Sequence, residues 1–596
     1  KAALQAHVEA GRVGALEELL GSRLEFGTAG LRAAMGPGSG RMNDLVVIQT
    51  TQGVCAYLEK SLGKEEAQRR GVCVGFDHRA CNGCDSRSMA RHVAAVCLQR
   101  GFRVFFYSDF VATLVPWCLE QHGCCAGVMV TASHNPAADN GYKLYWGNGA
   151  QIIPPHDARI AALIEENLEP WALPTSQFEV EDHPLFQDAG QSLEAYFSCI
   201  QSRLCLHQVQ NKEWAEKYPV VYTAMHGVGR RFVERAFDAF GHGRSSLHIV
   251  QEQAEPDPLF PTAAFPNPEE GKGALELAFR EADWAGASCR LVIANDPDAD
   301  RLAVAERLPV GSGWHVFTGN ELGSLLGHWA WRCWRERHPL PADASAVCMI
   351  ASTVSSKCLA ALAAQEGCRF EETLTGFKWM GSRSAELRAE GVDVIFAFEE
   401  AIGFCMGDVV KDKDGVAAAA VFVEMAKQLA SEGKSCLEHL AQLSDSYGLF
   451  LSSNSYVKSS DAALTRRLFE RQRGGPGQRS YCKEIGRFQV TGIRDLTTGY
   501  DSRTSDGRPE LPLNVGGEMI TYYFADVELG AVVTLRTSGT EPKIKWYSEM
   551  RSAGDRRQAC GALLEELVLA VVRQLLDPVG NGLEVRPEDH ALLTAA

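Results

Sequence analysis

A serine and a histidine interrupt a pattern that otherwise reads as two consecutive β-strands. Residues 127–152 begin as an apolar strand, break at TASHNP (residues 131–136) and resume as a second strand. Open α/β sheets bind ligands in the crevice beyond the carboxyl ends of their strands, so Ser133 is a candidate nucleophile held at such an edge. The flanking residues exclude the G-x-S-x-G elbow of hydrolases. A polar turn without chemistry is the alternative.

Three carboxylates follow another apolar strand at alternate positions. Residues 295–301 read NDPDADR between the apolar runs LVIA and LAVA. On an extended loop, alternate side chains face one way, so these carboxylates would gather around a cation, and their hard oxygen ligands suit Mg²⁺ or Mn²⁺. An EF-hand is excluded because its sixth and twelfth positions, which need Gly and Glu, hold Arg301 and Arg307. A solvated acidic turn is the alternative. The candidate ligands are Asp296, Asp298 and Asp300.

Two loops in the next part of the chain contain groups that can bind a polar ligand. Glu399 and Glu400 directly follow an apolar strand in FAFEEAIGF, and LTGFK precedes them at residues 374–378. Paired carboxylates can accept hydrogen bonds from vicinal sugar hydroxyls, although a solvated strand end has the same composition. The sequence KDKDG at residues 411–415 would, taken alone, be an exposed turn.

A fourth loop combines hydroxyls, a glycine and flanking cations. Residues 536–545 read RTSGTEPKIK between two predicted strands, and Gly539 would expose backbone N–H groups to an anion. A plain hairpin loop is the alternative. Together the four loops supply a nucleophile, a metal site, a hydroxyl-binding group and a phosphate clamp. Phosphoryl transfer needs this combination, because its transition state is stabilised by neutralising charge and by holding the reacting oxygens in line.

The elements that must position these loops alternate between strand and helix, which favours parallel sheets covered by helices. The predicted strands are Phe102–Ser108, Ala126–Thr131, Pro219–Thr223, Arg290–Ala294, Leu302–Glu306, Val347–Ser352 and Val392–Phe398. The predicted helices are Leu114–His122, Arg230–Phe240, Ser355–Glu366 and Lys378–Glu390.

After about residue 440 the pattern changes to that of a separate α+β domain. The expected strands are Tyr447–Val457, Met519–Phe524, Ala531–Arg536 and Ile544–Met550. The expected helices are Ala462–Gln472 and a long amphipathic helix at Arg556–Leu576. Linkers are expected at Trp171–Pro184, Gly311–Gly313 and Arg473–Gln478.

The composition excludes several classes of function. The 596 residues have a formal net charge of -16, so the basic footprint of a nucleic-acid binder is missing. No apolar run approaches the ~18 residues of a membrane span, and no signal peptide is visible. The 19 cysteines form no regular disulfide framework, which favours a reducing, cytoplasmic location. The lone C-x-x-C at residues 81–84 lacks a second pair of zinc ligands.

The motifs TASHNP, DPDADR, EEAIG and RTSGTEPKIK, in this order, resemble the α-D-phosphohexomutase superfamily. The resemblance covers nearly the whole chain from FGTAGLR at residues 26–32. The segments FGTAGLRAAMGPGSGRMND, NGYKLYW, PNPEEGKG and ETLTGFKWMG look most like its phosphoglucomutase-2 type, the phosphopentomutase branch. It implies an α/β protein of four domains around a central cleft. Three α/β sandwich domains would span residues 1–190 (phosphoserine loop), 191–309 (metal loop) and 310–445 (sugar loop), and an α+β domain with the phosphate loop would span 446–596.

The resemblance also implies roles for individual residues. Ser133 would cycle as phosphoserine, and one of its phosphate oxygens would join the three aspartates in holding Mg²⁺. His134 and Lys413 match the acid/base candidates, and Lys413 could act as a base only if its pKa fell toward working pH. The residues that match substrate contacts are Thr28 and Arg32 in the N-terminal segment, Arg301 at the phosphoryl group, Thr375 and Glu399 at the sugar, and Arg536, Ser538, Thr540 and Lys545 in the phosphate clamp.

By this resemblance the expected activity is a phosphosugar mutase. It would interconvert ribose or deoxyribose 1-phosphate and 5-phosphate, and glucose 1-phosphate and 6-phosphate, as a monomer primed by glucose 1,6-bisphosphate or ribose 1,5-bisphosphate.

Two departures from the family motifs bear on this expected activity. Ala401 replaces the serine of glucose-specific relatives, which implies looser hexose recognition, and Lys545 stands where many relatives have arginine. The rival activities are a glucose-1,6-bisphosphate synthase using 1,3-bisphosphoglycerate, a metal-dependent phosphohydrolase, and a non-catalytic sugar-phosphate sensor.

Overall fold

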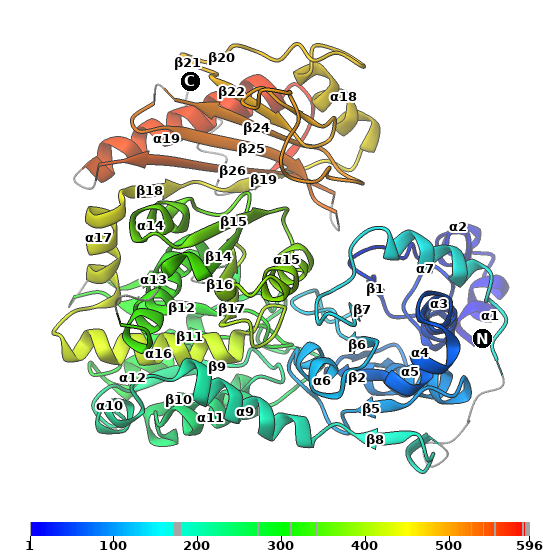
Figure 1. Cartoon of the computed structure of the whole chain (residues 1–596). Helices are drawn as coiled ribbons and strands as arrows, with labels where there is room; N and C mark the ends of the chain where they lie inside the picture. The colour runs from blue at the N-terminus through cyan, green and yellow to red at the C-terminus, as the bar shows by residue number, and fades with distance from the viewer. Residues whose placement is uncertain are drawn as a thin grey trace. The chain divides into compact units, whose positions relative to one another are not determined.

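The computed structural model describes residues 2–171, 180–270, 273–309, 313–339, 343–525, 527–539, 542–553, 556–586 and 589 (Figure 1). The chain divides into two compact units. The first contains Lys1–Leu322, Trp329–Ile350 and Gly376–Cys436, and the second contains Gly323–His328, Ala351–Thr375 and Leu437–Ala596. The predicted linkers at Trp171–Pro184 and Gly311–Gly313 lie partly outside the described residues.

The first unit opens with a mixed six-stranded sheet in the order β1-β7-β6-β2-β5-β8. Strands β2, β5, β6 and β8 run parallel, while β7 pairs antiparallel with both β6 and β1. The strands are β1 (Leu31–Ala34), β2 (Val72–Phe76), β5 (Val104–Phe106), β6 (Ala126–Val130), β7 (Asp139–Trp146) and β8 (Phe186–Asp188). The helices are α1 (Ala2–Glu9), α2 (Val13–Leu20), α3 (Asp44–Leu62), α4 (Lys64–Arg70), α5 (Ser86–Gln99), α6 (Val115–His122) and α7 (His156–Glu165).

This sheet is covered on both faces. Every residue of β2 and β6 is buried, and both strands pack against α5 and α6 (Figure 1). The continuous apolar runs are typical of parallel strands enclosed by helices. Helix α5 begins where the Asp85 carboxylate accepts a hydrogen bond from the Ser88 backbone N–H, and α3 begins at Asn43 in the same manner. A short hairpin of β3 (Ala80–Cys81) and β4 (Cys84–Asp85) leads into α5.

A second sheet in the same unit has the order β10-β9-β11-β12-β13. Its first three strands are parallel, and β12 and β13 are antiparallel additions. The strands are β9 (Val220–Thr223), β10 (Leu247–Ile249), β11 (Leu291–Ala294), β12 (Ala303–Arg307) and β13 (Trp314–Val316). The helices are α9 (Gln191–Leu204), α10 (Gln208–Glu213), α11 (Arg230–Phe240) and α12 (Glu276–Ala285). Gly241, in the left-handed conformation, ends α11.

The third α/β region contributes an antiparallel pair, β16 (Asp393–Glu399) and β17 (Gly403–Met406), to the first unit. Helix α15 (Phe377–Ala389) shares a buried apolar core with β16, and α16 (Gly415–Ser431) is buried along almost its whole length. The other elements of this region are α13 (Gly319–Arg337), β14 (Val347–Ser352), α14 (Cys358–Glu366), β15 (Arg369–Thr373) and α17 (Cys436–Tyr447).

The second unit contains a largely antiparallel sheet in the order β23-β22-β24-β25-β26-β19-β27, with β18 also paired to β26. Helix α19 packs on it and shares its apolar core (Figure 1). The strands are β18 (Leu449–Ser452), β19 (Ser455–Lys458), β20 (Glu484–Ile485), β21 (Phe488–Gln489), β22 (Gly492–Asp495), β23 (Tyr500–Asp501), β24 (Met519–Phe524), β25 (Ala531–Thr537), β26 (Lys543–Ser552) and β27 (Glu584–Val585). The helices are α18 (Ala462–Gln472) and α19 (Arg557–Val571).

Most predicted elements are found within one or two residues of their expected ends, but the single strand predicted at Tyr447–Val457 is wrong. Tyr447 is the last residue of α17, and β18 and β19 are separate strands. Between them the Asn454 side chain accepts a hydrogen bond from the Ser548 N–H of β26, where a continuous strand would use a backbone carbonyl. The helix predicted to end at Leu576 is α-helical only to Val571.

Two expectations from composition can be compared with the structure. All 19 cysteines are free thiols, and most are buried. Cys81 and Cys84 face each other across the β3–β4 hairpin without forming a disulfide. Among the described residues, no helix has the length and apolar character needed to cross a membrane.

Candidate active site

Ser133 lies in a strained turn directly after β6. Its φ of 53° is left-handed, which is uncommon for a residue other than glycine and is often found at active sites. The Ser133 N–H donates to Thr131 Oγ1 at 2.9 Å, which fixes the turn. The hydroxyl donates to Asp296 Oδ2 at 2.7 Å and lies 3.2 Å from His134 Nδ1. Only 4% of Ser133 is exposed, so its hydroxyl is buried against the Asp296 carboxylate.

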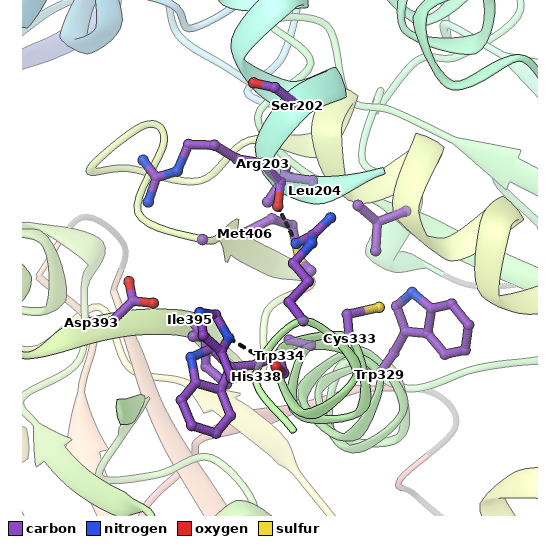
Figure 2. Close-up of a pocket in the computed structure, with 14 residues that line it drawn as sticks. Ser202, Arg203, Leu204, Trp329, Cys333, Trp334, His338, Asp393, Ile395 and Met406 are labelled. Carbon is purple, nitrogen blue, oxygen red and sulfur yellow. Dashed lines mark hydrogen bonds between the residues drawn. The ribbon is translucent and has the colours of Figure 1, made fainter. Parts of the chain in front are cut away.

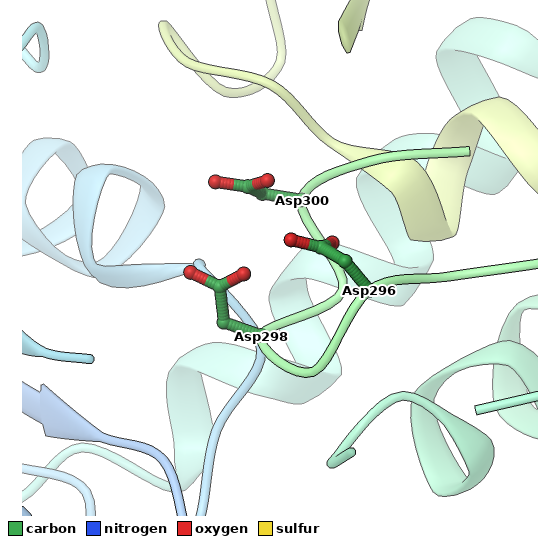
Figure 3. Close-up of side chains that lie close together, drawn as sticks. All are labelled: Asp296, Asp298 and Asp300. Carbon is green, nitrogen blue, oxygen red and sulfur yellow. The ribbon is translucent and has the colours of Figure 1, made fainter. Parts of the chain in front are cut away.

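The three aspartates converge at the end of β11, as Figure 3 shows. All three are buried, and one oxygen from each carboxylate lies within 4.8 Å of the others. The expected extended loop is wrong, because the segment is a turn with Ala299 at a left-handed φ of 55°. The turn, and not strand-like alternation, brings the carboxylates together. Burial also contradicts the alternative of a solvated acidic turn.

Lysines and hydroxyls from other elements balance this negative charge. Lys143 Nζ lies 2.7 Å from Asp298 Oδ2 and 3.0 Å from Asp300 Oδ2. Thr113 and Thr131 hydroxyls donate to the same Asp298 oxygen at 3.2 and 3.4 Å. The Oδ1 atoms of Asp298 and Asp300 are buried and have no hydrogen-bond partner among the described residues. A carboxylate set with such orphaned oxygens fits a hard divalent cation such as Mg²⁺.

The three carboxylates do not have equivalent acidities. Burial, followed by repulsion from Asp300 and Asp298, raises the pKa of Asp296 well above its ordinary value. Burial opposes ionisation of Asp300 as well, but Lys143 and Lys413 outweigh it and lower the pKa of Asp300. The carboxylate that accepts the Ser133 hydrogen bond is therefore the most basic of the three.

Arginines and a neutral histidine surround the serine. The Arg301 backbone N–H donates to Asp296 Oδ1 at 2.9 Å, and its side chain pairs with Glu269 at 2.9 Å. Arg32 Nη1 donates to Asn135 Oδ1 at 3.2 Å, which places Arg32 beside the serine loop. Burial, and then the charges of Arg301 and Arg32, lower the pKa of His134 well below its ordinary value. Burial and the two arginines therefore favour the neutral imidazole form of His134.

The KDKDG segment is buried, so the exposed turn suggested by its composition is wrong. Asp412 is fully buried and accepts hydrogen bonds from Tyr145 and Gln151, both at 2.8 Å. Lys413 Nζ lies 3.2 Å from Asp300 and 3.4 Å from Asp412. Burial alone would lower the pKa of Lys413, but Asp300 and Asp412 outweigh it and raise this pKa, contrary to the expected fall. In this arrangement Lys413 is a cation.

Thr28 of the predicted N-terminal segment and Glu399 of the predicted sugar contacts lie in the first unit. Thr28 Oγ1 accepts a hydrogen bond from Lys378 Nζ, at the start of α15. Glu399, the last residue of β16, accepts a hydrogen bond from the Gly376 N–H at 3.0 Å. Thr375 belongs to the second unit and is partly buried.

The predicted phosphate clamp lies on the β25–β26 hairpin of the second unit. Arg536 and Lys545 are directly opposite each other in the register of these strands. Arg536 Nη2 donates to the Tyr547 hydroxyl at 3.1 Å, and the Ser538 N–H donates to the Lys543 carbonyl at 2.9 Å. Thr540 lies outside the described residues. The connection is thus a hairpin, and its role as a clamp stays a prediction.

A separate pocket in the first unit contains none of the predicted site residues (Figure 2). Its walls come from the end of α9, from α13 and from the β16–β17 pair. Of the two arginines that line it, Arg337 donates to the main-chain carbonyls of Arg203 and Cys205. The chemistry expected from the sequence is therefore located at Ser133 and the aspartates, not at this pocket.

Sequence reasoning missed Lys143 and Thr113, which complete the aspartate cluster. Lys143 lies in the middle of β7, and its side chain is only 6% exposed. A lysine inside an otherwise apolar strand, NGYKLYW, was the available signal, because lysine is almost never fully buried without a partner. Thr113 gave no such signal.

Replacing Lys143 with methionine should destabilise the protein and make its stability depend on magnesium. Loss of the ammonium leaves the buried Asp298 carboxylate without a cation, whereas Asp300 keeps Lys413, and an uncompensated buried charge typically costs about 3 kcal/mol. Urea unfolding in EDTA should show this loss, and millimolar Mg²⁺ should restore part of it. Lys411→Met is the matched control, since Lys411 is equally buried but pairs with Glu120. Equal rescue of both variants by Mg²⁺ would contradict the assignment.

Comparisons with known proteins, by family models and by sequence similarity, point to the same family. Family models of phosphoglucomutase/phosphomannomutase alpha/beta/alpha domains I, II and III match residues 23–171, 194–310 and 319–447. Over 579 residues the chain is 46% identical to phosphopentomutase from Homo sapiens, covering 96% of this chain and 92% of the relative. It is 44% identical over 575 residues to glucose 1,6-bisphosphate synthase from Homo sapiens, covering 95% and 90%.

Among solved structures, the open form of parafusin, a phosphoglucomutase from Paramecium, matches with a TM-score of 0.68 at 17% identity. The match covers 94% of this chain and 96% of that chain. At this identity the likeness concerns the fold alone. With the family models it confirms the predicted class of three α/β domains followed by a C-terminal domain.

Proposed function

Because the chain belongs to the phosphoglucomutase/phosphomannomutase family, we propose that it is a phosphosugar mutase acting on pentose phosphates. It interconverts ribose or deoxyribose 1-phosphate and 5-phosphate, and it also acts on glucose 1-phosphate. The observation that carries the proposal is a buried serine hydroxyl 2.7 Å from one carboxylate of a three-aspartate cluster. The 46% identity to a phosphopentomutase supports the pentose assignment.

The residues that would hold Mg²⁺ are Asp296, Asp298 and Asp300, together with a phosphate oxygen carried by Ser133. The orphaned Oδ1 atoms and the burial of all three carboxylates support this assignment. When bound, the ion supplies positive charge that stabilises the phosphoryl group during its transfer.

The reaction uses Ser133 twice. Phospho-Ser133 donates its phosphoryl group to the free hydroxyl of a sugar monophosphate, so one O–P bond forms as the Ser133 Oγ–P bond breaks. Neutral His134, 3.2 Å from Ser133 Oγ, relays the proton: it accepts the proton of the attacking hydroxyl and gives a proton to Ser133 Oγ as the Oγ–P bond breaks. The resulting glucose 1,6-bisphosphate or ribose 1,5-bisphosphate then reorients, and Ser133 takes back the other phosphoryl group. Arg301 and the cationic Lys413 neutralise the charge of the group in transit.

The remaining predicted residues orient the sugar phosphate. Thr28, Arg32, Thr375 and Glu399 contact the sugar and its nearby phosphate in this proposal. Arg536, Ser538, Thr540 and Lys545 hold the phosphate that does not react, so they must accept either end of the substrate. The absence of a hydroxyl at Ala401 supports a site that does not demand a hexose.

We also propose that the enzyme works as a cytoplasmic monomer primed by the bisphosphate. Its free thiols support a reducing compartment. The three boundaries between the four domains, at residues 190/191, 309/310 and 445/446, stay a prediction. The monomeric state is also a prediction, which size-exclusion chromatography with light scattering would measure.

A substrate panel tests the proposed function. We expect isomerisation of ribose and deoxyribose 1-phosphates with Mg²⁺ and a trace of bisphosphate, and slower isomerisation of glucose 1-phosphate. Omitting the bisphosphate should produce a lag, because unphosphorylated Ser133 has no group to donate. Steady release of inorganic phosphate without isomerisation would instead identify a phosphohydrolase, and binding without turnover would identify a sensor.

The second candidate is glucose-1,6-bisphosphate synthesis, which the 44% identity to such a synthase favours. It would phosphorylate Ser133 from 1,3-bisphosphoglycerate. The same panel separates the two activities, because it compares two rates. If glucose 1,6-bisphosphate accumulates from 1,3-bisphosphoglycerate and glucose 1-phosphate faster than ribose 1-phosphate isomerises, the synthase assignment replaces the mutase assignment.

A further inference from the structure

We propose that Arg79 is the positioning residue of the catalytic serine: it holds the loop from Ser133 to Asp139 in the conformation that presents the Ser133 hydroxyl to the aspartates. The inference rests on the proposed function, because it assigns a role in phosphoryl transfer. Arg79 follows β2, the neighbour of the strand that leads to Ser133. It is fully buried, and no part of the proposed chemistry uses it directly.

The Arg79 guanidinium donates to four main-chain carbonyls of the serine loop. Nη2 lies 2.5 Å from the Ser133 oxygen and 2.7 Å from the Asn135 oxygen. Nη1 lies 2.8 Å from the Pro136 oxygen and 3.1 Å from the Asp139 oxygen. One planar group therefore fixes both ends of the loop. The Pro136 carbonyl also accepts from the Asp139 N–H at 3.0 Å, and Arg79 adds donors for the Ser133 and Asn135 carbonyls.

Arg79 is in turn held by a buried polar network. Asp77 Oδ2 lies 3.4 Å from Arg79 Nε, and Asp77 Oδ1 accepts hydrogen bonds from the Arg79 N–H and the Ser86 hydroxyl. Asn140 Nδ2 donates to the same Ser86 oxygen at 3.0 Å. Asp77, Ser86 and Asn140 are all almost completely buried. The guanidinium therefore has a fixed position from which to orient the loop.

The arrangement orients the dipoles of the loop. A trans peptide is planar with its C=O and N–H opposed, so the peptide whose Ser133 carbonyl faces Arg79 directs the His134 N–H away from the guanidinium. Ser133 must keep its left-handed backbone while its side chain alternates between a neutral hydroxyl and a phosphate dianion. The buried Arg79 guanidinium can hold this backbone in both the unphosphorylated and the phosphorylated state, because it contacts main-chain carbonyls that phosphorylation does not change.

A residue from the second α/β region completes the site. The Phe260 ring lies over the guanidinium, with the Arg79 carbon 5.2 Å from the ring centroid. This contact covers the cation from a segment that is distant in sequence. Lysine could not replace the arginine, because a single ammonium group lacks the planar fork that reaches four acceptors.

The test compares Arg79→Lys and Arg79→Gln with the wild-type enzyme and with a destabilised control, Val93→Ala, in the buried core of the same region. The measurements are kcat, KM, the folded fraction, and the partition of radiolabelled phosphoenzyme between sugar phosphate and water. We expect kcat of Arg79→Lys to fall by about 100-fold, the usual effect of misplacing a reacting group by about 1 Å. KM should stay nearly unchanged, and a larger share of phosphoenzyme should be lost to water.

Val93→Ala should keep the wild-type kcat per folded molecule and the wild-type partition of phosphoenzyme between sugar phosphate and water. A residue that only stabilises the fold changes the fraction of folded molecules and not the activity of each folded molecule. Arg79→Gln provides a second variant if the lysine form is poorly folded. The proposal is overturned if both variants match the wild type, or if both lose activity only in proportion to their folded fraction with an unchanged partition. Absence of mutase turnover in the wild-type arm would overturn the proposed function as well, so the two failures are distinguishable.

Discussion

Alanine at position 133 is expected to abolish turnover while leaving the protein folded. In the proposed mechanism the wild-type hydroxyl forms the covalent intermediate, and loss of a covalent nucleophile typically lowers kcat by about 10⁴-fold or more. The side chain is small and its main contacts are to Asp296 and His134, so the fold should not depend on it. A coupled isomerase assay measures the loss, and intact-protein mass spectrometry should show that the phosphorylated form has disappeared.

Ser108→Ala is the matched control for Ser133→Ala. Ser108 also lies after a strand of the first sheet, but it is exposed and its hydroxyl donates to Asp188 at 3.1 Å. This variant should retain wild-type kcat and the phosphorylated species. A Ser133→Ala enzyme with a near-normal rate would require another nucleophile and would refute the mechanism.

Replacing Asp298 with asparagine should cause the second-largest loss. The change removes a charge from the cluster but keeps an oxygen that can accept from Thr113 and Thr131. We expect kcat to fall by about 10³-fold, equivalent to about 4 kcal/mol of transition-state stabilisation, the scale on which a bound metal ion acts. The Mg²⁺ concentration for half-maximal activity should rise, which a titration of activity against Mg²⁺ measures.

An exposed aspartate provides the comparison for the Asp298 variant. Asp283 lies at the surface and pairs with Arg307, so Asp283→Asn should change neither kcat nor the Mg²⁺ requirement. Calorimetric titration with Mn²⁺ gives an independent readout, because loss of a ligand should weaken binding even where no turnover is measured. Unaltered metal affinity in Asp298→Asn would remove this residue from the metal site.

The strands that lead into the site could be predicted closely from the sequence. Continuous apolar runs such as LVIA define β11 and leave no competing assignment, because a strand buried on both faces tolerates few polar residues. The resemblance of the motifs to the phosphohexomutase superfamily also predicts that Ser133 and the aspartates share one site. The structure brings them within hydrogen-bonding distance across 163 residues of chain.

The details that sequence reasoning missed depend on tertiary contacts. Alternation along the chain suggested an extended aspartate loop, yet a positive φ at Ala299 determines where the carboxylates meet. The charged KDKDG segment looked exposed, but Tyr145 and Gln151 from another region enclose Asp412. The pKa of Lys413 could not be inferred from cationic neighbours alone, because the nearer carboxylates decide its direction. Lys143 stands out in the sequence as a lysine within a strand, whereas Arg79 is recognisable only once its partners are known.

The left-handed backbone at residue 133 restricts how the proposed catalytic serine could be replaced in evolution. Threonine carries the same hydroxyl, but a branched Cβ is rarely tolerated at positive φ. A substitution of serine by threonine would therefore keep a hydroxyl group but disturb the left-handed backbone conformation that positions it. A phosphothreonine could function at this position only if the turn adopted a different backbone conformation. The main-chain conformation therefore selects serine as strongly as the reaction does.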